Sequence, residues 1–133
     1  MLISQTAEYA LRVMTQLAIL QSPGTVSREE LARETRIPVH FLAKIMRKLV
    51  TARLVTAKRG AGGGFVLAHP LHEIPLADVL EAVGYDFELN RCAFGCARCN
   101  NLKPCPLHGV WSRAKESFRN WAEKTTLADI GKG

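Results

Sequence analysis

The four cysteines of the chain lie within a span of fourteen residues, in the run RCAFGCARCNNLKPCPLH. They are Cys92, Cys96, Cys99 and Cys105. Closely spaced thiolates are the ligands preferred by zinc and by iron–sulfur clusters. Small and turn-forming residues between them let a loop converge on a metal, and the cations Arg91, Arg98 and Lys103 favour the thiolate form. The sequence therefore predicts a metal or redox centre in this segment.

Spacing alone leaves three kinds of chemistry open to these cysteines. The first is an iron–sulfur cluster, either [2Fe–2S] or [4Fe–4S]. The second is a structural zinc site made by Cys96, Cys99, Cys105 and either Cys92 or His108. The third is a thiol switch without a metal, such as a disulfide between Cys96 and Cys99.

An enzymatic role for the thiols is disfavoured. Cys96-Ala-Arg-Cys99 has the Cys-x-x-Cys form of disulfide reductases, but the surroundings lack the βαβ pattern that such a site needs. We therefore expect that the protein is not an enzyme.

The rest of the chain suggests a compact cytoplasmic protein. It has 133 residues, of which 47% are hydrophobic, enough for one domain with a core and an appended arm. No apolar run approaches the roughly 20 residues of a membrane span, and the N-terminus lacks the pattern of a signal peptide. In the cytoplasm, clustered cysteines bind metals or undergo redox chemistry more often than they form a disulfide framework.

Positive charge is concentrated in one stretch. The formal net charge is +6, and between Glu34 and Glu73 there are seven Lys or Arg residues and no acid. Such local asymmetry is typical of a surface that contacts phosphates. Double-stranded DNA is the expected partner, although a solvated basic face is the simpler alternative.

Helical spacing predicts the elements that come before this stretch. A first helix runs from about Thr6, its proposed N-cap, to Leu20. Ser27 and Glu30 form the pattern of a capping box that begins a second, shorter helix ending at Thr35.

A third helix, opened by Ile37-Pro38, has two distinct faces. Apolar residues at helical spacing form one face: Leu42, Ile45, Met46 and Leu49. The other face is made by His40, Ala43, Lys44 and Arg47. The short link between the second and third helices fits a helix-turn-helix, whose polar face would enter the major groove.

A β-hairpin is predicted directly after the third helix. Leu54–Lys58 and Phe65–Ala68 have strand character, and the glycine-rich turn Arg59–Gly64 joins them. A hairpin in this position is a wing, with Lys58 and Arg59 available to DNA near its tip. A nucleotide-binding glycine loop is excluded, because no Gly-Lys-Ser/Thr follows and a strand comes next.

The fold class expected is mainly α with a small β-hairpin wing, a winged helix-turn-helix followed by a long C-terminal dimerisation helix. A short helix is predicted over Leu76–Val83 and a long one from Pro106 to Lys124, and Thr126 is a candidate cap for a last turn, Leu127–Ile130. The stripe of the long helix is Leu107, Val110, Trp111, Ala114, Phe118 and Trp121. We divide the chain into a DNA-binding domain at 1–84, a cysteine-rich loop at 85–105, and a helix and tail at 106–133. The stripe suits the seam of a homodimer.

Several motifs together resemble the Rrf2 family of winged-helix bacterial transcription regulators, over nearly the whole chain. They are Thr6-Ala-Glu-Tyr-Ala10, Ile37-Pro38 through Lys48-Leu49, the wing Arg59–Ala68, Ile74–Val79, Cys105-Pro-Leu-His108 and Thr125–Asp129. The resemblance implies a homodimeric regulator, expected to be a repressor, that senses redox state, nitric oxide or iron through an iron–sulfur cluster. The alternatives are a zinc-stabilised or thiol-switch regulator and a protein adaptor built on a degenerate winged helix.

The resemblance also assigns roles to particular residues. Cys92, Cys99 and Cys105 match the cluster-ligating cysteines, and Cys96 departs from the family pattern. The remaining ligand would be His108 or an acid near the N-terminus, here Glu8, donated across the dimer. His40, Ala43 and Lys44 match base-reading positions, and Arg59 matches a wing arginine that enters the minor groove.

Overall fold

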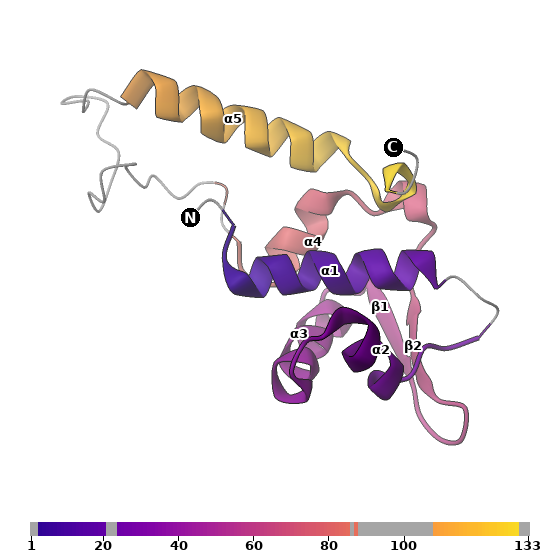
Figure 1. The fold of residues 1–133 in the computed structure, drawn as a ribbon. Coiled ribbons are helices and arrows are strands. Elements are labelled where there is room, and N and C mark those ends of the chain that lie inside the picture. The colour runs from indigo at the N-terminus through magenta and orange to yellow at the C-terminus, as the bar shows by residue number, and fades with distance from the viewer. Residues whose placement is uncertain (1–2, 21–23, 86, 88–107, 131–133) are drawn as a thin grey trace.

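The structure is a computed structural model that describes residues 3–20, 24–85, 87 and 108–130. Helices and a two-stranded hairpin follow one another in the order shown in Figure 1. Their bounds are α1 (Gln5–Ile19), α2 (Arg28–Thr35), α3 (Val39–Thr51), β1 (Val55–Lys58), β2 (Gly64–Leu67), the 3₁₀ turn η1 (Leu71–Glu73), α4 (Leu76–Ala82), α5 (His108–Lys124) and the 3₁₀ turn η2 (Leu127–Asp129). This confirms the predicted fold class, mainly helical with one antiparallel hairpin.

Helix α1 begins two residues earlier than a cap at Thr6 would place it. Ser4 is its N-cap, and the Ser4 hydroxyl accepts a hydrogen bond from the amide of Ala7 at 3.2 Å. The prediction that Thr6 caps this helix is therefore wrong. Both residue types are good caps, and the helix that begins after Ser4 includes Ala7 and Ala10, which are both buried.

The helix-turn-helix follows from local signals. The Ser27 hydroxyl accepts from the amide of Glu30 at 3.1 Å, which confirms the predicted cap of α2. Helix α2 is followed by its C-cap, Arg36, whose φ of 58° places it in the left-handed region. That turn brings the chain to Pro38, which precedes the first residue of α3. The predicted inward face of α3 is confirmed, with Leu42, Ile45, Met46 and Leu49 all buried.

The hairpin is joined to the segment before α2. Strands β1 and β2 pair antiparallel, with Val55 opposite Leu67 and Lys58 opposite Gly64. Val26 extends this pairing, because its amide donates to the carbonyl of Phe65 at 2.9 Å and its carbonyl accepts from the amide of Phe65 at 2.8 Å. The wing is thus fixed on one edge to the entrance of the helix-turn-helix.

The C-terminal part returns to the same core. The amide of Leu76 donates to the carbonyl of Thr125 at 2.8 Å, and the amide of Leu127 donates to the carbonyl of Ile74 at 3.1 Å. Leu127 is only 1% exposed. Thr126 caps η2 in a capping box with Asp129, as predicted for the last turn.

Helix α5 lies on the other side of α1 from α2, α3 and the wing (Figure 1). Of its predicted stripe, Phe118 packs against the core, whereas Val110 and Trp121 remain 59% and 44% exposed. Ala122, which the predicted stripe omits, is the fully buried residue of this helix. Within the described residues no helix is both long and apolar enough to cross a membrane.

We predict that Gly64→Ala destabilises the fold. Gly64 has a φ of 155°, and a Cβ atom added there would collide with the carbonyl of Val26. Overpacking of this kind costs about 1–3 kcal/mol, so urea should unfold the variant at a clearly lower concentration. Gly109→Ala in α5 is the matched control, because an added methyl meets only the far end of the Arg113 side chain. Equal midpoints for wild type and Gly64→Ala would contradict the close approach.

Candidate nucleic-acid interface

The exposed face of α3 carries most of the residues that the sequence assigned to DNA contact. His40, Lys44 and Arg47 are exposed, and Ala43 between them is partly buried. They lie on the side opposite the buried stripe, as the helical spacing predicted. The imidazole of His40, the cations Lys44 and Arg47 and the small side chain of Ala43 share one face, which a duplex could approach closely.

Helix α1 holds the helix-turn-helix through Arg12. One terminal nitrogen of Arg12 donates to the carbonyl of Thr35, the last residue of α2, at 2.9 Å. The other contacts the Glu8 carboxylate at 2.7 Å. The guanidinium also lies over the ring of Tyr9, 5.2 Å from its centroid, and Tyr9 packs edge-on against Phe41 of α3. Sequence reasoning missed this link, because it joins residues 23 positions apart.

The wing places Lys58 and Arg59 at the surface. Both residues are exposed, at the end of β1 and the start of the turn. The hydroxyl of Thr25 donates to the carbonyl of Gly62 in that turn at 2.6 Å. A Cβ atom at Gly63 would collide with the carbonyls of Lys58 and Gly60. The turn is therefore held in one compact shape by its glycines and by a residue outside the hairpin.

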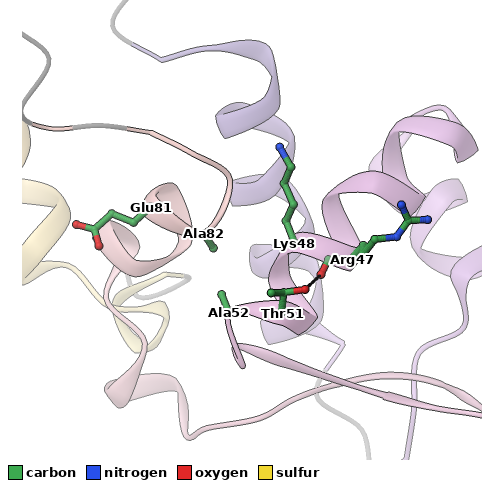
Figure 2. Close-up of a pocket in the computed structure, with 6 residues that line it drawn as sticks. All are labelled: Arg47, Lys48, Thr51, Ala52, Glu81 and Ala82. Carbon is green, nitrogen blue, oxygen red and sulfur yellow. Dashed lines mark hydrogen bonds between the residues drawn. The ribbon is translucent and has the colours of Figure 1, made fainter.

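An open groove of about 410 Å³ lies between the end of α3 and α4. Figure 2 shows that its charged side chains point away from one another, with Glu81 on one side and Arg47 on the other. Thr51 is already engaged, because its hydroxyl donates to the carbonyl of Arg47 at 2.9 Å. The groove therefore lacks converging polar groups of the kind that hold a small ligand.

Of the candidate metal ligands, Glu8 is the one whose side chain lies among the described residues. Cys92, Cys96, Cys99 and Cys105 lie outside the described residues, as does the side chain of His108, which is the first residue of α5. The Glu8 side chain is 56% exposed and paired with Arg12. Among residues 3–20, 24–85, 87 and 108–130, no three His, Cys, Asp or Glu side chains come together as a metal site. The donor set itself, four closely spaced thiols, fits an iron–sulfur cluster or zinc.

An aromatic cluster connects the residues before the first cysteine to α5. Tyr85 and Phe87 lie 4.8 Å apart between ring centroids, and both contact Phe118 of α5, at 5.7 and 6.0 Å. Trp121 continues the row, 5.5 Å from Phe118. Burial raises the pKa of the Tyr85 phenol. Tyr85 and Phe87 are therefore anchored to α5 by packed rings.

A basic recognition helix beside a hairpin defines the class, a winged helix-turn-helix protein. The chain belongs to the Rrf2 family, described as iron-dependent transcriptional regulators, whose family model matches residues 3–133. It is accordingly a DNA-binding transcriptional regulator and not an enzyme.

Named relatives agree with this assignment. A protein of Mycobacterium tuberculosis, Rv1287, is 39% identical over 143 residues, which cover 100% of this chain and 83% of the relative. A protein of Aquifex aeolicus is 32% identical over 132 residues, 98% of this chain and 91% of its own. Both carry the name of an HTH-type transcriptional regulator.

Two solved structures share the fold. CymR, the global cysteine regulator of B. subtilis, superposes with a TM-score of 0.80 at 24% identity, over 96% of this chain and 94% of CymR. IscR of T. potens gives a TM-score of 0.76 at 24% identity, over 96% of this chain and 84% of IscR. These likenesses establish the winged-helix architecture.

We predict that Thr25→Val weakens DNA binding without unfolding the protein. The change keeps the shape of the side chain and removes the hydrogen bond to Gly62, so the wing turn is less firmly held. The loss of one such bond corresponds to about a two- to twelve-fold weaker affinity. The measurement is fluorescence anisotropy on the duplex that the wild-type protein enriches from a random pool, called here the selected operator.

Thr6→Val is the matched control, since Thr6 is an exposed threonine on α1. Thermal unfolding of both variants should resemble that of wild type, because the Thr25 hydrogen bond lies at the surface. Unchanged affinity of Thr25→Val would show that the glycine turn keeps its shape without the hydrogen bond from Thr25.

Proposed function

We propose that the protein is a homodimeric repressor that binds a two-fold symmetric operator and responds to redox state, nitric oxide or iron through a cysteine-ligated iron–sulfur cluster. In this proposal α3 enters the major groove with His40, Ala43, Lys44 and Arg47. Lys58 and Arg59 of the wing contact the adjacent backbone and minor groove.

The observation that carries the DNA part is the position of the positive charge. The seven cations between Glu34 and Glu73 have no acid among them in the sequence. All seven lie on α3, on β1 or in the turns that flank them, and all seven are exposed: Arg36, Lys44, Arg47, Lys48, Arg53, Lys58 and Arg59. A surface of this kind gains affinity for a duplex by displacing its counterions.

The dimer part rests on α5 and on the geometry of operators. Val110 and Trp121 expose apolar surface on one long helix, and aromatic residues are enriched in the buried centres of protein interfaces. Helix-turn-helix proteins usually bind paired half-sites as dimers. A second copy of the chain on α5 would supply both the apolar contact and the second recognition helix.

The cluster part rests on the donor set and its surroundings. Cys92, Cys99 and Cys105 would bind the cluster, with Cys96, His108 or the partner subunit's Glu8 as the remaining ligand. When bound, a cluster supplies a redox-active centre that nitric oxide and oxidants attack. The chain's own residues would transmit the order of the cysteine loop to the dimer interface on α5. The route is the aromatic contact of Tyr85 and Phe87 with that helix. A tenfold effect on DNA affinity needs only about 1.4 kcal/mol of coupling.

A second candidate is a regulator that uses its cysteines as a zinc site or a thiol switch. It is favoured by the fold shared with CymR of B. subtilis, a cysteine regulator, and with CymR of Staphylococcus aureus, which has been solved in an oxidized form. In this alternative Cys96 and Cys99 form a disulfide, or the cysteines hold zinc, and the DNA-binding surface is unchanged.

We predict that Arg59→Ala weakens binding to the selected operator and lowers the slope of log affinity against log salt by about 1. The reason is that one cation fewer displaces counterions from the duplex. Lys124→Ala is the control, because it removes an exposed cation from the end of α5, on the far side of the molecule from the wing (Figure 1). An unaltered slope for Arg59→Ala would support a protein adaptor over a DNA-binding wing.

For the cluster we predict that anaerobically purified protein is brown and absorbs visible light. Native mass spectrometry should show the mass of one cluster for each chain, in a dimer. Replacing Cys92, Cys99 or Cys105 with Ser should remove both the colour and the added mass. A colourless protein with one zinc per chain would support the structural-metal alternative, and a metal-free Cys96–Cys99 disulfide the thiol switch.

A further inference from the structure

Val39 is an exposed apolar residue at the start of the recognition helix. It is the first residue of α3, and 57% of its surface is exposed. A single exposed valine needs no explanation on an ordinary surface. Val39, however, lies in the first turn of the proposed recognition helix. Recognition helices contact base edges in the major groove with their N-terminal residues.

The neighbours of Val39 identify the kind of partner that can cover it. Ala43 follows four positions later, on the same side of the helix and partly buried. His40, Lys44 and Arg47 continue the exposed face. Every turn of α3 after the first carries an exposed cation. Such a face favours a polyanion over a protein with an apolar surface. The occupant of this face is therefore DNA, and the valine meets whatever apolar group the duplex offers.

The major groove offers one such group. Base pairs present hydrogen-bond donors and acceptors there, and only thymine adds a methyl group, at C5. An isopropyl side chain can neither donate nor accept a hydrogen bond, so it distinguishes base pairs through that methyl alone. Its β-branching leaves one strongly preferred rotamer in a helix, which keeps the two methyl groups in a fixed place. Ala43 has no atoms beyond Cβ and leaves this space open.

We infer that Val39 is a specificity-determining residue that reads the 5-methyl group of a thymine in each operator half-site, with Ala43 completing the apolar surface. This inference deepens the proposed function and rests on its placement of α3 in the major groove. The contact would require a thymine at one position of each operator half-site. The cations cannot impose such a requirement, since contacts to phosphates carry no sequence information.

The experiment uses the full chain and the selected operator. Each thymine is replaced in turn by deoxyuridine, which removes the methyl group and keeps every hydrogen-bonding group of the base. Burying one methyl-sized group corresponds to about a four-fold change in affinity. We therefore expect wild-type protein to bind about four-fold more weakly when one particular thymine of a half-site is replaced. Val39→Ala should show less than about a two-fold difference between the same two duplexes.

Val110→Ala is the matched control, because Val110 is a valine of similar exposure on α5. It should keep the full uracil penalty of wild type, whatever its effect on overall affinity. Val39→Ala itself should unfold at the temperature of wild type, since Ala is the best helix former and the site is exposed.

The outcomes separate this inference from the function it rests on. Val39 does not read thymine if every uracil duplex binds wild type as well as the thymine duplex does, or if Val39→Ala keeps the full uracil penalty. In either case the proposed DNA-binding function is unaffected. If the protein enriches no duplex at all, the proposed DNA-binding function fails and the inference fails with it.

Discussion

The buried stripe of α1 is the constraint on which the rest of the molecule depends. Ala10, Val13, Met14 and Leu17 are at most 3% exposed. On one side α1 packs against α2, α3 and β2, and on the other against α4 and η2. Its position between the two groups is visible in Figure 1. A helix that contributes to both sides fixes their relative orientation, because close-packed interiors transmit small displacements instead of absorbing them. The recognition helix and α4, which precedes the cysteines along the chain, therefore both pack against one common helix.

The distribution of charge follows from the same arrangement. Ion pairs join Glu8 to Arg12 on α1 and Arg119 to Glu123 on α5, each within a single helix. Such exposed pairs add little stability, but they join each of these acids to a cation of its own helix. The exposed cations of α3 and the hairpin are then available to phosphates. Arg12 differs from them, because it is committed to Thr35 and Glu8 and acts as a structural tie.

The proposed coupling between cysteines and DNA has a physical route through packed side chains. The rings of Tyr85 and Phe87 lie against Phe118 of α5, and the α4 residues just before Tyr85, including Val79 and Leu80, are buried in the core that α1 shares. In the proposed function, an ordered cysteine segment adds to the contacts that hold α5 against this core. Because only about 1–3 kcal/mol is typical of coupling between sites, a change in the packing of a few rings is of the right size.

The sequence by itself determined the features that depend on neighbours along the chain. These include the two faces of α3, the Ser27 cap, the hairpin and its glycine turn, and the Thr126 cap, since helical spacing, capping and turn chemistry act within a few residues. It also supported the assignment to a family of regulators through motifs spread over the whole chain. Its prediction of cysteine ligation stays a prediction, because those residues lie outside the described part.

Only the tertiary structure decided which of several local options the chain uses. Ser4 and Thr6 are both good caps by residue type, and the structure uses Ser4. The contacts of Arg12 with Thr35, Thr25 with Gly62 and Val26 with Phe65 join residues 23, 37 and 39 positions apart. Similarly, nothing local distinguishes the buried Ala122 from the exposed Val39. Contacts of this range depend on how the elements pack in space, and no periodicity in the sequence encodes the direction from which a distant segment arrives.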